Sequence, residues 1–122
     1  LRAYEQSKLA NVLFARELAR REPGLDVFAF DPGLVDTAMG QKGGGLSSII
    51  WSLRRRSGVH PSVPAADLAA LALDPAYSGR TGGYWLGLKE RQASARALEP
   101  ESSSRLWGIS EILTEQAIQT NV

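Results

Sequence analysis

A tyrosine and a lysine near the start of the chain have the spacing of a proton-transfer pair. Tyr4 and Lys8 are four residues apart in a segment free of proline and glycine, so on a helix their side chains share one face. A free phenol titrates near pH ~10, and a close ammonium lowers that pKa by about 1–3 units. We therefore expect Lys8 to lower the pKa of Tyr4. Such a tyrosine can protonate a carbonyl oxygen or deprotonate an alcohol, while the lysine keeps donors for a sugar diol.

The pair indicates proton transfer only if the surrounding elements also fit an active site, because Tyr-x-x-x-Lys also occurs by chance on solvated helices. Residues 4–21 are rich in Ala, Leu, Arg, Glu and Lys and are followed by Pro23-Gly24, which predicts a helix. The apolar run 25–30 predicts a strand buried on both faces, as in a parallel sheet. Asp31-Pro32-Gly33 ends it, because proline cannot donate to a ladder and glycine permits a sharp turn.

The rest of the chain continues the alternation of helices and strands. The stretch 34–64 is long and irregular, with a short amphipathic helix expected around 46–53 after Gly43-Gly44-Gly45. The later segments predict a helix, a strand and a last amphipathic helix, at 64–73, 84–88 and 101–116. This order is α/β, and we expect the two strands to lie side by side and parallel, joined by a crossover that contains the middle helix.

Composition excludes several classes of function. The 122-residue chain has no cysteine and one histidine, so disulfides, thiol catalysis and zinc–thiolate sites are excluded and we expect no metal. That histidine, His60, is interpreted as a loop residue. A formal net charge of +1 gives no electrostatic reason to bind nucleic acid. No apolar run approaches the ~20 residues that span a bilayer, and no signal peptide opens the chain, so we expect a cytoplasmic protein.

Four stretches resemble a known family. Tyr4-Glu5-Gln6-Ser7-Lys8-Leu9-Ala10-Asn11 resembles the active-site helix of short-chain dehydrogenases/reductases, above all the retinol-dehydrogenase-like and protochlorophyllide-reductase-like branch. Phe30-Asp31-Pro32-Gly33-Leu34-Val35-Asp36-Thr37 resembles the family's strand, Pro-Gly turn and threonine, although Asp31 stands where the branch commonly has His. Thr81-Gly82-Gly83-Tyr84-Trp85 and Leu106-Trp107-Gly108-Ile109-Ser110-Glu111 resemble the last strand and the C-terminal helix. The resemblance therefore covers the whole chain.

The resemblance implies an α/β fold, the C-terminal part of a Rossmann-type doubly wound parallel sheet with two strands and flanking helices. Residues 1–122 would form the C-terminal half of a single short-chain dehydrogenase/reductase domain: active-site helix, Pro-Gly loop, lid, last strand and C-terminal helix. The family places its Gly-rich nucleotide turn and its catalytic Ser and Asn before the tyrosine, and none of these occurs here. We therefore expect the isolated chain to be inactive or nearly so.

The resemblance also implies an activity, an NAD(P)-dependent interconversion of an alcohol and a carbonyl on a small-molecule substrate. Tyr4 would be the general acid/base, and Lys8 would lower its pKa and hold the nicotinamide ribose.

The resemblance also implies that the loop after the first strand contacts the nicotinamide. Pro32 and Gly33 would line the nicotinamide, and the backbone of Val35 and the hydroxyl of Thr37 would bond its carboxamide or the phosphates. The loop leaves the carboxyl end of a parallel strand, which is where α/β sheets bind ligands. The cofactor would be NADP or NAD, with NADP favoured by the branch.

Two other functions stay open. The chain could be a truncated, non-catalytic interaction module. It could also belong to a relative that uses the Tyr-Lys pair for sugar epimerisation or dehydration. Those enzymes typically have a larger C-terminal substrate domain than the 85 residues that follow Thr37.

The surfaces allow two further interpretations. Two apolar faces of the first helix leave open a homo-oligomer formed through it; they consist of Leu9, Val12 and Leu13, and of Ala10, Phe14 and Leu18. Membrane association through Arg54-Arg55-Arg56 after Ile49-Ile50-Trp51 is open but less favoured than a substrate lid. Packing roles are expected for the three tryptophans, Trp51, Trp85 and Trp107.

Overall fold

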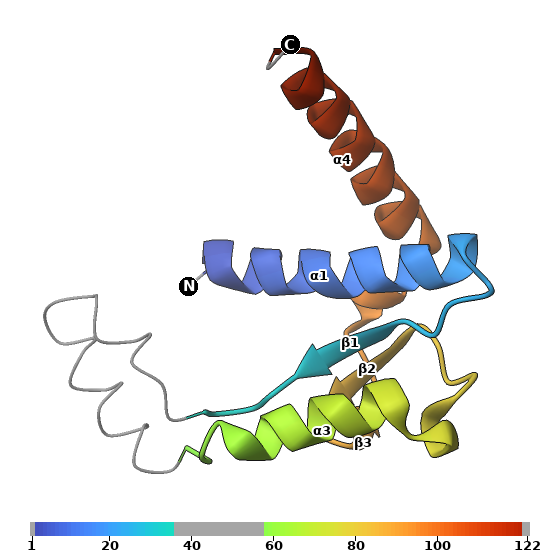
Figure 1. The fold of residues 1–122 in the computed structure, drawn as a ribbon. Helices are drawn as coiled ribbons and strands as arrows, with labels where there is room; N and C mark the ends of the chain where they lie inside the picture. Colours follow the sequence, from blue (N-terminus) through green and yellow to red (C-terminus); the bar gives the residue numbers. More distant parts are fainter. Residues whose placement is uncertain (1, 36–57, 121–122) are drawn as a thin grey trace, which may run out of the picture. The chain divides into compact units, whose positions relative to one another are not determined.

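The computed structural model describes residues 2–35 and 58–120, and its helices and strands follow an α/β order (Figure 1). The chain divides into two compact units, which are described separately. The first comprises residues 1–29, 78–84 and 90–122, and the second comprises 30–77 and 85–89. Several predicted features lie outside the described residues, namely Thr37, Trp51, Arg54-Arg55-Arg56 and the helix around 46–53.

Three strands form one mixed sheet in the order β1-β2-β3. Their bounds are β1 Phe28–Asp31, β2 Gly83–Leu86 and β3 Lys89–Arg91. The N–H of Gly82 donates to the carbonyl of Val27 at 2.7 Å, and the N–H of Gly87 donates to the carbonyl of Asp31 at 3.1 Å. Strands β1 and β2 therefore run in the same direction, and the predicted parallel pair is confirmed.

The third strand corrects the sequence-based expectation, which places two strands in the sheet and no strand between 84–88 and the last helix. Lys89-Glu90-Arg91 consists of three charged residues, so it lacks the apolar alternation that predicts a strand. The sequence signal for this strand, which the sequence analysis missed, lies in the turn before it. Gly87 has a φ of 56° at the first position of a two-residue connection, which suits a tight antiparallel hairpin. The chain is thus a small α/β structure, and its doubly wound character stays a prediction.

Helix α1 carries the candidate catalytic pair and spans Arg2–Arg21, which confirms the helix predicted at 4–21. No residue in it breaks the backbone hydrogen bonding, and the Pro23-Gly24 turn follows directly. Leu13 and Ala15 of α1 are buried, as is Ala97 of the short 3₁₀ helix η3, Ala95–Leu98, which α1 contacts.

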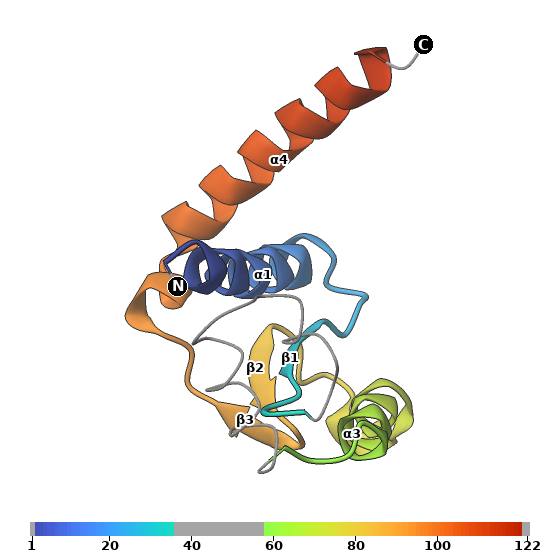
Figure 2. The ribbon, with the colours of Figure 1, turned by 90° about the vertical axis from the view of Figure 1, so that its left-hand side faces the viewer.

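Helix α4, Pro100–Thr120, packs against the C-terminal half of α1 through aromatic rings. The rings of Phe14 and Trp107 are stacked, with centroids 5.4 Å apart and planes 8° apart. The guanidinium of Arg21 lies 4.8 Å from the centroid of the same indole. Figures 1 and 2 show α4 beginning beside α1 and running on beyond it. The packing role predicted for Trp107 is confirmed.

A buried carboxylate adds a polar link to this helix pair. The side chain of Glu17 is 2% exposed and accepts hydrogen bonds from Arg20 at 2.6 and 3.0 Å and from Arg21 at 2.7 Å. The hydroxyl of Ser104 on α4 lies 3.4 Å from the same carboxylate. Hydrogen bonding to Arg20 lowers the pKa of Glu17 most, burial opposes it and Arg21 adds to the lowering, so the pKa falls from 4.5 to about 2.

The second unit is organised around helix α3, Ser62–Leu73, and the tryptophan of β2. Trp85 is fully buried, which confirms its predicted packing role, and its ring meets Tyr77 edge-on with centroids 5.5 Å apart. Leu71 of α3 is also buried. The short 3₁₀ helix η2, Pro75–Tyr77, follows α3, and Asp74 binds the N–H groups of Ala76 and Tyr77.

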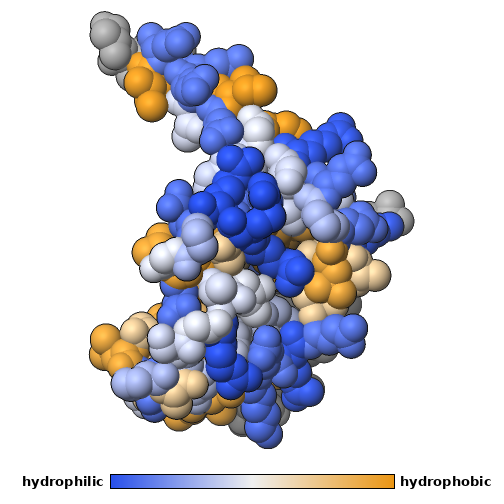
Figure 3. Space-filling model, turned by 90° about the vertical axis from the view of Figure 1, so that its right-hand side faces the viewer, coloured by the Kyte–Doolittle hydropathy of each residue, from blue (hydrophilic) through white to orange (hydrophobic). Residues whose placement is uncertain are grey.

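Much apolar surface remains exposed in the described residues. Beyond its contact with α1, helix α4 presents four large apolar side chains that are 47–66% exposed: Ile109, Ile112, Leu113 and Ile118. The last helix, which the sequence predicts to be amphipathic, therefore leaves much of its apolar side uncovered, and Figure 3 shows apolar surface along it. Helix α3 likewise exposes Leu68 and Leu73. None of the helices within 2–35 and 58–120 is long and apolar enough to cross a membrane.

Loss of the Glu17 charge is expected to destabilise the protein at neutral pH but not in strong acid. Because the pKa of Glu17 is lowered in the folded state, its contribution is complete above pH 4.5 and is lost as the pH falls toward about 2. Urea unfolding of the full-length gene product and of Glu17→Gln, at neutral pH and near pH 2, measures the difference. Glu22→Gln, an exposed change directly after the same helix, is the matched control. A Glu17→Gln effect that is equal at both pH values would contradict this prediction.

The 122-residue chain expressed alone is expected to be poorly stable or to self-associate. Its uncovered apolar side chains on α3 and α4 favour association, and a parallel sheet needs both faces covered. Analytical ultracentrifugation with thermal melting checks this expectation, and Ile112→Lys with Leu113→Lys should reduce any association. A monomer with a sharp, cooperative transition would show instead that the chain is a self-sufficient module.

Candidate functional site

The structure brings Tyr4 and Lys8 together on one face of α1. The Lys8 Nζ atom lies 5.4 Å from the centroid of the Tyr4 ring. Tyr4 is 65% exposed and Lys8 is also exposed, so both polar groups can reach a ligand. The hydroxyl of Ser7 donates to the carbonyl of Tyr4 at 2.7 Å and is thus engaged with its own helix. The spacing in the sequence therefore places the ammonium within cation–π range of the phenol ring.

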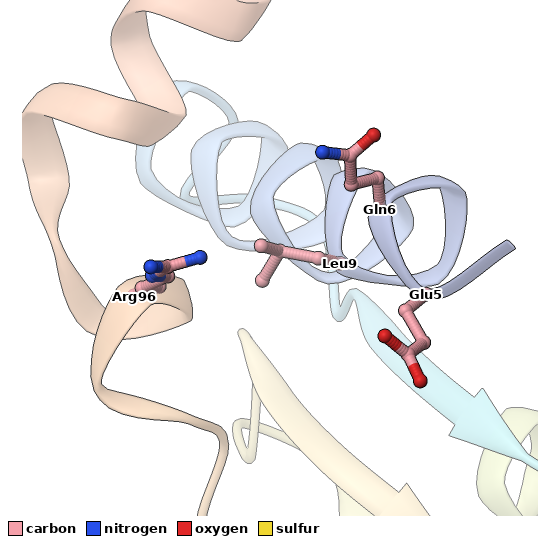
Figure 4. Close-up of a pocket in the computed structure, with 4 residues that line it drawn as sticks. All are labelled: Glu5, Gln6, Leu9 and Arg96. Carbon is pink, nitrogen blue, oxygen red and sulfur yellow. The ribbon is translucent and has the colours of Figure 1, made fainter. Parts of the chain in front are cut away.

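A hollow of about 450 Å³ lies beside another face of α1 (Figure 4). Glu5, Gln6 and Leu9 of α1 line it, together with Arg96 of η3. Tyr4 and Lys8 are not among the described residues that line this hollow. It brings an acidic and a basic side chain, Glu5 and Arg96, close to the N-terminal half of α1. No pattern in the sequence predicts that Arg96 lies there.

The Pro-Gly loop belongs to the second unit and follows the carboxyl end of β1. Gly33 has a φ of 70°, a conformation that favours glycine. Its N–H donates to the Asp31 Oδ1 atom at 2.8 Å, so the carboxylate closes a local Asx-type turn around Pro32. Pro32 and Gly33 are both exposed. The family resemblance describes Asp31 only as a replacement for His. The sequence signal for its turn-closing role is an aspartate two residues before a turn glycine.

Val35, the next predicted cofactor contact, is fixed by a parallel bridge to Val59. The hydrogen bond runs from the N–H of Val59 to the carbonyl of Leu34, at 3.0 Å. Because this bond uses the carbonyl of the preceding residue, it leaves the peptide N–H of Val35 out of the pairing. Thr37, which the sequence places beside it, lies outside the described residues.

The predicted site residues thus form two groups. Tyr4 and Lys8 belong to the first unit, whereas Pro32, Gly33 and Val35 belong to the second. The first has a phenol next to an ammonium. The second has an exposed glycine turn after a parallel strand, a place where α/β proteins commonly bind ligands. An α/β chain with these two features resembles the nucleotide-dependent oxidoreductases.

Comparison with known proteins finds similarity to retinol dehydrogenases. The chain is 33% identical to mouse retinol dehydrogenase 14, a match that covers 90% of this chain and 34% of that protein. It is 35% identical to human retinol dehydrogenase 12 (88% and 34%) and 30% identical to the WW domain-containing oxidoreductase of Danio rerio (95% and 29%). These matches confirm the predicted relationship to the retinol dehydrogenases of the short-chain dehydrogenase/reductase family.

The match has a defined extent. The chain spans about a third of the length of the curated relatives that it matches. No protein-family model matches the chain, and no solved structure gives a significant match.

Substitution of the turn glycine is expected to strain the candidate cofactor loop. Gly33→Ala forces a residue with a Cβ into positive φ, which costs about 1 kcal/mol, although the nearest atom to the new Cβ, Leu86 Cδ1, is at 3.6 Å. Gly24→Ala is the matched control, because it has no atom within 4 Å and no positive φ, and it should be neutral or stabilising. Urea unfolding of the full-length gene product compares the two; equal midpoints would show that the turn relaxes.

Proposed function

We propose that this chain supplies the catalytic pair and the nicotinamide-side loop of an NAD(P)-dependent oxidoreductase that interconverts an alcohol and a carbonyl. The observation that carries the proposal is the Lys8 ammonium 5.4 Å from the ring of Tyr4, in a chain related to retinol dehydrogenases. In this proposal residues 1–122 form the C-terminal half of a single short-chain dehydrogenase/reductase domain.

The proposed chemistry centres on one proton. In carbonyl reduction, the Tyr4 hydroxyl gives its proton to the substrate oxygen as that oxygen gains negative charge; in alcohol oxidation, the phenolate takes the proton back. The Lys8 ammonium favours the phenolate through its positive charge. Because Tyr4 and Lys8 are both exposed on α1, a substrate and a sugar diol can approach them from the same side.

The described residues fit a nicotinamide cofactor, which when bound supplies or accepts the hydride. Lys8 has N–H donors for the ribose hydroxyls. At Gly33 the absence of a Cβ and the exposed backbone permit close approach of a flat ring, with Pro32 beside it. The peptide N–H of Val35 is directed away from its bridge to Val59 and can donate to a carboxamide. We include Thr37 in this group from the family pattern.

The proposed substrate is a small apolar alcohol or carbonyl compound. Two relatives carry retinol dehydrogenase in their names, so retinal is the first aldehyde to assay, together with other apolar aldehydes. A preference for NADP is part of the proposal from the family branch, and a cytoplasmic location is proposed from the sequence analysis alone.

Two substitutions separate the proposed roles in the full-length gene product. Tyr4→Phe is expected to lower turnover about 100-fold or more and to leave NADPH affinity nearly unchanged, because it removes only the proton that is transferred. Lys8→Ala is expected to lower turnover and also to weaken NADPH binding, because the ammonium serves both the phenol and the ribose. Steady-state oxidation of NADPH with retinal, and fluorescence titration with NADPH, measure the two effects.

The control is Glu5→Gln, an exposed change on the same helix turn that keeps the helix propensity. A Tyr4→Phe enzyme with normal turnover would mean that the tyrosine is structural and would refute the proposed function. The chain of residues 1–122 assayed alone is expected to show no turnover.

A further inference from the structure

The Pro32-Gly33 turn is held on both sides by hydrogen bonds within the second unit. Before the turn, the carbonyl of Asp31 accepts a hydrogen bond from the N–H of Gly87 at 3.1 Å. After it, the carbonyl of Leu34 accepts one from the N–H of Val59 at 3.0 Å. These two bonds fix where the chain enters and leaves the turn, but neither of them involves Pro32 or Gly33 themselves.

The two residues of the turn differ in how far their own chemistry restricts them. The ring of Pro32 holds its φ near about −65°. A glycine, in contrast, populates positive and negative φ about equally. Gly33 has a φ of 70°. A contact, rather than the type of residue, must therefore select this one conformation of Gly33.

The side chain of Asp31 supplies that contact. The N–H of Gly33 donates to the Asp31 Oδ1 atom at 2.8 Å, which is the length of a well-formed hydrogen bond. The N–H meets this oxygen only while the peptide before Gly33 keeps one orientation. Because Asp31 is the last residue of β1, its carboxylate fixes the turn relative to the end of the strand.

The surface that the turn presents depends on this orientation. Pro32 and Gly33 are both exposed, and the nearest atom to a Cβ built on Gly33 is Leu86 Cδ1, at 3.6 Å. A proline ring and an uncovered peptide thus lie next to each other at the surface. The apparent affinity for a flat ring on this surface scales with the fraction of molecules in which Gly33 has the right conformation.

We propose that Asp31 is a positioning residue that presets the Pro32-Gly33 turn for the nicotinamide ring of the cofactor. The inference rests on the proposed function, because that function assigns the turn to the nicotinamide. Asp31 itself touches neither the cofactor nor the substrate. It acts through the oxygen that accepts the hydrogen bond of Gly33, and an asparagine offers the same acceptor.

The test compares Asp31→Ala, Asp31→Asn and Asp26→Ala with the unmodified full-length gene product. Asp31→Ala removes the acceptor, whereas Asp31→Asn keeps an oxygen in the same place. Asp26→Ala is the matched control. Both carboxylate oxygens of Asp26 accept from the N–H of Gly79 at 3.0 Å, and Gly79 also has a positive φ, 78°. The control therefore removes a similar contact, but one that lies before β1 rather than after it.

Two dissociation constants distinguish positioning from a general loss of structure. One is that of NADPH, and the other is that of adenosine 2′,5′-bisphosphate, which carries the adenosine end of NADPH without the nicotinamide. We expect Asp31→Ala to bind NADPH about three- to tenfold more weakly, because Gly33 loses its restraint. Its affinity for the bisphosphate should not change. Asp31→Asn should bind NADPH within about twofold of the unmodified protein, and Asp26→Ala should change neither constant.

Each other result overturns the proposal. If Asp31→Ala binds NADPH as tightly as the unmodified protein, the carboxylate does not preset the turn. Equal losses for both ligands, or the same NADPH loss in Asp26→Ala, would mean a general loss of structure. If Asp31→Asn does not restore NADPH affinity, the hydrogen bond is not the cause.

Failure of the proposed function would be seen in different measurements. Normal turnover in Tyr4→Phe would refute the general acid/base, whatever the Asp31 variants do. An unmodified full-length protein that binds no NADPH would overturn the proposed function and the role of Asp31 together.

Discussion

A carboxylate that is 2% exposed must have partners for its charge, and this requirement fixes the C-terminal half of α1. Glu17 meets it with two arginines of its own helix and with Ser104 of α4. The stacked rings of Phe14 and Trp107 lie one turn away and cover the apolar side of the same contact. Because α1 is one continuous helix, holding this end also sets the direction of the end that carries the candidate catalytic pair.

The helix α1 therefore combines two kinds of surface along one axis. Its second half supplies buried and paired residues, and its first half supplies accessible ones, with Ala15 near the boundary between them. A helix is well suited to this division, since its backbone hydrogen bonds are satisfied internally and side chains that a ligand needs can stay uncovered. The proposed catalytic residues then need no contact with the protein core to keep their spacing.

Most helix ends and turns of the fold can be predicted from local sequence signals. Features that depend on contacts between distant segments cannot. Helix ends follow from breakers such as Pro23-Gly24, and the glycine turn at Gly33 follows from its proline neighbour. Glu17 is different: an acid three and four residues before two arginines is typical of a solvated surface pair, and only the packing of α4 makes it buried. Likewise the charged strand β3 has no periodicity to predict it, because hydrogen bonding to β2 defines it.

The turn closed by Asp31 has a consequence for protein engineering. Its hydrogen bond and its one positive φ both lie within three consecutive residues, Asp31 to Gly33. The conformation of this turn is therefore determined by these three residues alone, and it can be transferred to another protein. Grafted as a tripeptide onto the carboxyl end of another parallel strand, it would bring its shape with it, whereas the nearby segment at Val35 would have to bring Val59 as well.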